Sequence, residues 1–147
     1  MSKFEYMRDF EVKDKTARFT LHAISVGDKS PTLIVKPASE ANKPYFNALL
    51  KRAHTYAAQM QANKLTDSMV AENRDEDRDL YAKYVLADWE NVVDADGAEV
   101  KFSSEAAGDF VGALPNWVFD DLRAFCARPV NFVDAKSIVD AGTSGKN

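Results

Sequence analysis

Residues 80–102 read LYAKYVLADWENVVDADGAEVKF, and the rest of the chain is organised around them. Four aromatic or apolar side chains in this run recur at helical spacing: Tyr81, Tyr84, Val85 and Trp89. The spacing predicts a helix that ends near Glu90. Two short β-rich runs, 92–93 and 100–102, then flank the dipeptide Asp96-Gly97, which favours a tight turn because glycine adopts positive φ without a Cβ clash. We therefore expect a helix followed by a two-stranded hairpin.

Two further helices are predicted after this hairpin. Ser103 or Ser104 is suited to cap the first of them, and Pro115 separates the first helix from the second. The second helix ends at Arg128-Pro129, because the residue before a proline is driven out of the helical region. Apolar side chains at helical spacing give the inward faces of the pair: Ala107, Phe110, Val111, Leu114, Val118, Phe119, Leu122, Phe125 and Cys126.

The N-terminal part of the chain predicts a second hairpin. Side chains alternate between apolar and polar from Arg18 to Ser25, and Thr32–Val35 is a β-branched, apolar run. Turn-forming residues 27–31 connect the two strands. In residues 1–16 only a short strand around Phe10 and Val12 is indicated.

A long helix is predicted to follow the N-terminal hairpin and to fade near Asn63. Asn42 is placed to cap it, and Pro44 lies in its first turn, where a missing N–H costs little. Its apolar stripe is predicted to be buried: Phe46, Leu49, Leu50, Ala53, Ala57 and Met60. After a connection, the acidic cluster 75–77 is predicted to begin the next helix, where carboxylates favour the positive end of the helix dipole.

Together these elements predict an α+β fold in one helix-rich domain over residues 1–134. Its order is an N-terminal β-hairpin, a long helix, and then helix, β-hairpin and two helices. A chain of 147 residues is long enough for one such core. Residues 135–147 contain mainly Gly, Ser, Thr, Asp and Lys, with Ile138 and Val139 as the large apolar side chains, so we expect a flexible C-terminal tail.

Composition argues against several classes of partner. The net charge is −4 and the basic residues are scattered, whereas a nucleic-acid surface needs clustered Lys and Arg. No run approaches the roughly 18 apolar residues of a membrane span, and the N-terminus lacks a signal peptide's apolar run. Cys126 is the only cysteine, which excludes an internal disulfide and favours a reducing compartment. We expect no nucleic-acid and no membrane partner, and a cytoplasmic location.

The strongest catalytic pattern is Asp94 with Glu99 and Lys101, because metal-dependent nucleases use two carboxylates and a lysine. Its spacing is poor: a tight turn places Asp94 opposite Glu99 and leaves no room for a cleft. The same tripeptide, Glu-Val-Lys, also occurs at residues 11–13. We interpret the pattern as a solvated hairpin.

No other reactive set is predicted. His22 and His54 lie far from Cys126 in the sequence, and Cys126 sits on an apolar helix face as a small hydrophobe would. No Cys/His cluster has zinc spacing, and no Gly-rich loop opens a helix. The sequence therefore predicts no catalytic residue, no metal and no cofactor, and a protein that is not an enzyme.

The order of these landmarks resembles the tail assembly chaperones of long-tailed, siphovirus-like bacteriophages, over roughly residues 18–134. The resemblance rests on five runs: Val35-Lys36-Pro37-Ala38-x-x-Ala41-Asn42-x-Pro44-Tyr45, Leu80-Tyr81-x-x-Tyr84-Val85-Leu86-x-x-Trp89-Glu90, Val92-Val93-Asp94-x-Asp96-Gly97-x-x-Val100-x-Phe102-Ser103, Ala113-Leu114-Pro115-x-x-Val118-Phe119-x-x-Leu122 and Asn131-Phe132. It carries no catalytic signature.

What the resemblance implies is a non-enzymatic role in the host bacterial cytoplasm. Such chaperones bind the phage tape measure protein, keep it soluble until the tail tube polymerises, and are absent from the finished particle. The tail tube protein, or a frameshifted longer form of the chain, are further partners. The ending Gly145-Lys146 is compatible with such a frameshift. The alternatives are a structural tail or head–tail junction component that stays in the virion and, third, a small metal-dependent nuclease.

A binder of amphipathic helices needs an exposed apolar groove, and an acidic surface suits a basic client. We predict this partner-binding surface on the last two helices, around Phe110, Trp117 and Phe119.

Overall fold

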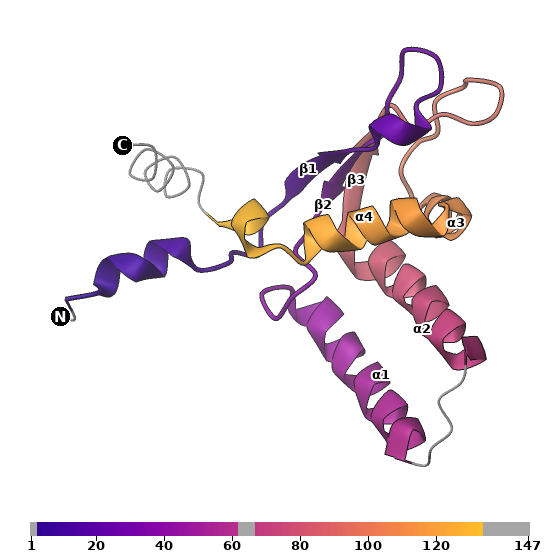
Figure 1. The fold of residues 1–147 in the computed structure, drawn as a ribbon. Coiled ribbons are helices and arrows are strands. Elements are labelled where there is room, and N and C mark those ends of the chain that lie inside the picture. The colour runs from indigo at the N-terminus through magenta and orange to yellow at the C-terminus, as the bar shows by residue number, and fades with distance from the viewer. Residues whose placement is uncertain (1–2, 62–66, 134–147) are drawn as a thin grey trace.

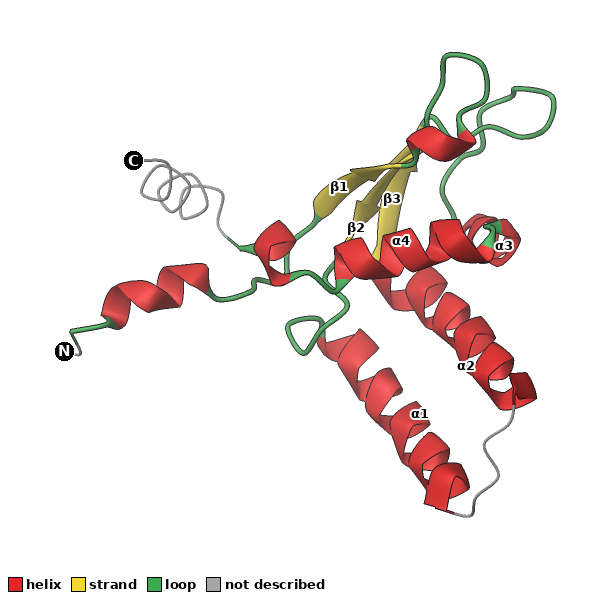
Figure 2. Cartoon of the chain, viewed as in Figure 1, coloured by secondary structure: helices red, strands yellow, loops and turns green. Residues whose placement is uncertain are grey.

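The computed structural model describes residues 3–61 and 67–133 (Figures 1 and 2). Its elements in chain order are η1 (Glu5–Phe10), β1 (Ala17–Thr20), η2 (His22–Ile24), β2 (Thr32–Val35), α1 (Lys43–Gln61), α2 (Asp67–Leu80), the π-helical turn η3 (Tyr81–Val85), β3 (Leu86–Glu90), α3 (Ser104–Ala113), α4 (Asn116–Cys126) and η4 (Pro129–Phe132). The predicted α+β class is confirmed. The predicted flexible tail lies outside the described residues.

The sheet has three antiparallel strands in the order β1-β2-β3. The N-terminal hairpin is therefore confirmed, with Phe19 opposite Leu33. The first strand is shorter than predicted, because Leu21 leaves the extended conformation and a 3₁₀ turn, η2, replaces the strand as far as Ile24. Leu21 itself is buried, and its N–H donates to the carbonyl of Pro31 at 2.8 Å. The predicted strand at Phe10 is instead the end of a 3₁₀ helix.

Trp89 lies on a strand, and the prediction of a helix as far as Glu90 is wrong. The helix ends in the π-helical turn η3, after which Leu86 becomes extended. From there the chain pairs with β2, so that Trp89 lies opposite Leu33 and its indole packs on Phe102. Pairing with a strand some fifty residues earlier outweighs the local helical spacing, as tertiary context commonly does.

The turn at Gly97 is confirmed, with φ of 83°, but the strands predicted on either side are not regular. The described residues here form one isolated bridge, between Val93 and Glu99, and the N–H of Val100 donates to the carbonyl of Val92 at 2.8 Å. Asp94 stabilises the turn, because its side chain accepts hydrogen bonds from the N–H groups of Asp96 and Ala98.

The last two helices are as predicted. The hydroxyl of Ser103 accepts a hydrogen bond from the N–H of Ala106 at 3.0 Å and caps α3. The inward positions predicted on both helices are buried or half-buried. α4 lies across one face of the sheet, where Phe125 packs on Phe19 with ring centroids 4.6 Å apart (Figure 1).

The predictions for α1 and α2 need two corrections. The acidic cluster lies within α2, which begins at Asp67, so Asp77 is buried and does not stand at a helix start. Asn42 directly precedes α1, but its side-chain amide donates to the carbonyl of Tyr84 at 2.8 Å. The side-chain oxygen of Asn42, which a cap would use, has no partner among the described residues.

Only one edge of the α1 stripe is buried, so the prediction of a fully buried stripe is wrong. Tyr45 is buried against Tyr81, and Leu49 packs partly on the core. Leu50 is 52% exposed, and Ala53 and Ala57 are also exposed. The physical reason is direction: α1 extends away from the sheet and from α4, as Figure 1 shows. The side chain of Met60, the last predicted member of the stripe, lies outside the described part of the chain.

Candidate protein-interaction surface

The exposed apolar side of α1 is the first candidate surface. It consists of Phe46, Leu50, Ala53 and Ala57, which we call the α1 face. The intervals of four, three and four residues place these side chains along one line of the helix. Phe46 is half-buried and the other three are exposed, so the face begins at the body and continues outward along α1.

The charged side chains of α1 are basic. The helix contains Lys43, Lys51 and Arg52 and no Asp or Glu, and Arg52 lies away from the α1 face and pairs with Asp77. The next helix, α2, exposes four carboxylates, those of Glu72, Asp75, Glu76 and Asp79. The two neighbouring helices therefore carry charges of opposite sign.

An open groove of about 270 Å³ is the second candidate surface. It lies between α2 and α3 and is lined by Asp75, Arg78, Asp79, Ala82, Gly108 and Gly112. A Cβ atom added at Gly108 or Gly112 would meet nothing within 4 Å. Packing among the described residues therefore does not require these two glycines, although each costs a helix interior about 1 kcal/mol relative to alanine.

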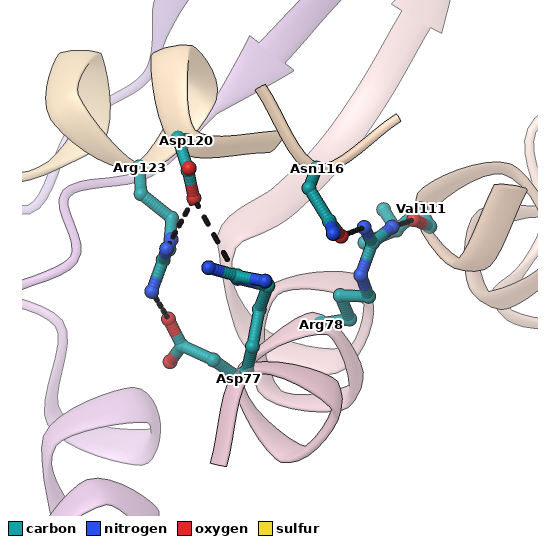
Figure 3. A network of polar contacts seen from close by, with 7 residues as sticks. Asp77, Arg78, Val111, Asn116, Asp120 and Arg123 are labelled. Carbon is teal, nitrogen blue, oxygen red and sulfur yellow. Dashed lines mark hydrogen bonds and ion pairs between the residues drawn. The ribbon is translucent and has the colours of Figure 1, made fainter. Parts of the chain in front are cut away.

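Arg78 connects this groove to α4. Its guanidinium donates to the carbonyl of Val111 at 2.5 Å and to the side-chain oxygen of Asn116 at 2.7 Å (Figure 3). The same group stacks 4.8 Å from the ring centroid of Phe119. A buried arginine thus satisfies a carbonyl near the end of α3 and positions the first turn of α4, which contains Trp117.

A second set of ion pairs holds α1, α2 and α4 together. The carboxylate of Asp77 accepts from Arg52 at 3.1 Å. It also accepts from Arg123 at 3.3 Å (Figure 3). Arg123 also donates to Asp120, and this hydrogen bond is the main reason why the pKa of the Asp120 carboxyl is lowered. These contacts fix the direction in which α1 leaves the body.

The three predicted partner-binding residues do not form one surface. Trp117 is 58% exposed, whereas Phe119 is fully buried beneath the guanidinium groups of Arg78 and Arg123. Phe110 is half-buried and packs on Trp89, with centroids 5.3 Å apart. Of the three, Trp117 is the side chain that a partner can reach.

Glu99 and Lys101 line an open cleft beside β3, with a volume of about 650 Å³. Asp94 does not line this cleft, because its side chain accepts hydrogen bonds within the turn, so the predicted pair of carboxylates does not share the cleft. Two carboxylates that do line the cleft have cationic partners: Glu90 pairs with Arg18 at 2.6 Å, and Glu99 lies 3.5 Å from Lys29. Across the described residues, no group of three or more His, Cys, Asp or Glu could hold a metal ion.

The remaining reactive side chains lie apart. His22 and His54 are exposed, on η2 and α1. Cys126 is buried in the core as predicted, and burial raises the pKa of its thiol.

The fold and these surfaces define a small α+β protein with exposed apolar and aromatic helix surfaces. None of the helices in residues 3–61 and 67–133 is long and apolar enough to cross a bilayer. The model of the YdaY prophage protein family matches residues 40–142, more than two thirds of the chain, and the chain belongs to that family. This confirms the phage origin expected from the resemblance. No curated protein and no solved structure matches the chain.

Proposed function

We propose that this phage protein is a non-enzymatic tail assembly chaperone. It binds the tape measure protein in the host bacterial cytoplasm and keeps that protein soluble while the tail is assembled. The observation that carries the proposal is the α1 face, an apolar helix surface that the described chain leaves exposed. Exposed apolar stripes of this kind mark sites where another helix docks. Membership of a prophage family supplies the phage setting.

The α1 face suits an amphipathic client helix. Ala53 and Ala57 are small, so the side chains of a client helix can pack between and beside the larger Phe46 and Leu50. Burial of one Leu-sized side chain contributes about 1.5–3 kcal/mol, so a few such contacts give useful affinity. The lysines of α1 favour acidic residues at the edge of that client helix.

Trp117 and the α2–α3 groove provide a second contact area for the same client. Trp117 is a large exposed anchor of the type enriched at interfaces. The groove presents Asp75 and Asp79, which suit a basic segment. A long, helix-rich client offers both kinds of segment at different places along its length.

The test is co-expression with the long, helix-rich protein encoded beside this one, with soluble client and co-purified client as readouts. The chaperone increases both. The matched variants are Ala57→Asp and Ala58→Asp, because both alanines are exposed and the second points about 100° away from the α1 face. We expect Ala57→Asp to lose most of the co-purified client and Ala58→Asp to retain it. Circular dichroism confirms that both variants fold.

Two further results decide between the chaperone and its alternatives. A client that stays insoluble with the wild-type chain overturns the proposal. Mass spectrometry of purified phage particles decides against the structural alternative if the chain is absent. A fixed number of copies per particle identifies a component of the tail or head–tail junction instead.

A further inference from the structure

The N-terminal helix η1 presents a second exposed apolar face. A 3₁₀ helix has three residues per turn, so residues at intervals of three lie on one side. Phe4, Met7 and Phe10 have this spacing and are 60%, 54% and 43% exposed. We call residues 3–12 the arm, and these three side chains the arm face. Every residue of η1 is exposed, whereas Val12, at the end of the arm, packs against the core.

The arm is attached to the body at its C-terminal end, where Val12 packs against the core. The N–H of Lys13 donates to the carbonyl of Phe132 in η4 at 2.8 Å. From this point η1 extends away from the sheet and from the distal end of α1 (Figure 1). The chain therefore displays two apolar faces, on η1 and on α1, that do not meet within one copy.

We propose that the arm of one copy docks on the α1 face of a second copy, and that the second copy's arm docks on the first in the same way. The product is a two-fold symmetric dimer with two identical contacts, the commonest symmetry of soluble oligomers. This inference goes beyond the proposed function, because the dimer needs no client.

Charge is the first argument for this occupant. The arm carries the carboxylates of Glu5, Asp9 and Glu11 and the cations of Lys3 and Arg8, so its net charge is −1, and Glu5 pairs with Arg8 at 3.2 Å. α1 carries basic side chains and no carboxylate, and one of these side chains, Arg52, pairs with Asp77 of the body. Opposite charge at the borders of two apolar faces favours their association and fixes the register. A second copy of α1 would instead place basic helix against basic helix.

Dimensions are the second argument. The arm face spans six residue steps, about 12 Å at the rise of a 3₁₀ helix. The α1 face spans eleven steps from Phe46 to Ala57, about 16 Å at the rise of an α-helix. The bulky side chains of the arm face can therefore lie over Ala53 and Ala57, bounded by Leu50 and Phe46.

The dimer also connects to the client site. Because the arm covers the α1 face, a client helix must displace it, so dimer formation and client binding compete. The face is then protected from non-specific association until a client arrives.

Sedimentation velocity of the full chain over a range of concentrations tests the proposal. We expect a dimer for the wild type and monomers for Met7→Asp and Ala57→Asp, because each substitution puts a charge into both contacts. The matched controls Arg8→Gln and Ala58→Asp change exposed residues off the two faces and remain dimeric. Both monomeric variants keep the wild-type circular dichroism spectrum.

Mixing the two monomeric variants is the decisive step. The intact arm of the Ala57→Asp chain can dock on the intact α1 face of the Met7→Asp chain, which restores one of the two contacts. We expect a heterodimer with a Kd at least tenfold above that of the wild type. A monomeric wild type, a Met7→Asp variant that stays dimeric, or a mixture that stays monomeric each overturns the proposal.

The dimer and the proposed function fail independently. Met7→Asp leaves the α1 face unchanged, so this variant still binds client if the chaperone assignment is right. Loss of the dimer with retained client binding separates the two surfaces. A wild type that dimerises as described and binds no client rejects the chaperone and leaves the dimer standing.

Discussion

The carboxylate of Asp77 on α2 lies 3.3 Å from the guanidinium of Arg123 on α4. Its other oxygen lies 3.1 Å from Arg52 on α1, and the Asp77 side chain is only 8% exposed. One buried carboxylate thus connects three helices, and Figure 3 shows its contact with Arg123. Together with the packing of Tyr45 on Tyr81, these ion pairs set the direction in which α1 and its exposed face leave the body.

Replacing Asp77 by alanine should destabilise the protein by about 2–3 kcal/mol. Removing one partner of a buried pair costs about 3–5 kcal/mol because the other charge stays buried and unpaired. The value is reduced here because Arg52 and Arg123 keep some contact with solvent. Urea unfolding measures the change, and hydrogen exchange should show faster opening of α1.

Asp79→Ala is the matched control. Asp79 lies two residues further along α2 and pairs with Lys83 at 3.0 Å, but both side chains are exposed. An exposed pair of this kind contributes less than about 0.5 kcal/mol. Equal effects of the two substitutions would show that Asp77 does not have the connecting role described here.

Local signals in the sequence predict the C-terminal half of the fold well. Ser103 caps α3, Pro115 separates α3 from α4, and Gly97 takes positive φ, all as the residue types indicate. Each of these signals acts within a few residues, so tertiary contacts do not change the outcome. β3 could not be predicted in this way, because its conformation depends on pairing with β2, far away in the sequence.

The candidate surface was only partly predictable for a related reason. The apolar stripe of α1 is plain from its spacing, but periodicity does not say whether another element covers it. Coverage depends on where α1 leaves the body, which the contacts of Tyr45 and Asp77 decide. Phe119 and Trp117 show the same limit: they lie two residues apart on α4, and one is buried while the other is exposed.

The two tryptophans should give clearly different fluorescence. Trp89 is buried, and its indole N–H donates to the carbonyl of Val100 at 2.8 Å, whereas Trp117 is open to solvent. Trp117→Phe should therefore leave a blue-shifted emission that iodide does not quench. Trp89→Phe should leave a red-shifted emission that iodide quenches strongly. Similar quenching of both variants would contradict the placement of the two indoles.

Loss of the Ser103 cap should cost about 1 kcal/mol. The hydroxyl accepts from the N–H of Ala106, and an alanine leaves that donor in the first turn without its partner. Ser103→Asp should retain most of the stability, because a carboxylate also caps and favours the helix N-terminus. Ser104→Ala is the control, since Ser104 is the first helical residue. Urea midpoints of the three variants decide whether Ser103 is the cap.

Tyr45 should make the protein sensitive to alkali. Burial raises the pKa of its phenol from 10.0 to about 12, and the nearby charge of Asp77 adds to the shift. A pKa that is raised in the folded state gives stability that is fully present below pH 10 and is lost as pH rises towards 12. Thermal unfolding across this range should therefore show a falling Tm.

The variant Tyr45→Phe removes the titrating group and keeps the ring that packs on Tyr81. Its Tm should fall less than that of the wild type over the same pH range, because the phenylalanine has no charged form to bury. Tyr6→Phe is the control: Tyr6 is exposed on η1, so this variant should follow the wild type. If Tyr45→Phe follows the wild type instead, the buried phenol of Tyr45 is not a source of the alkaline loss.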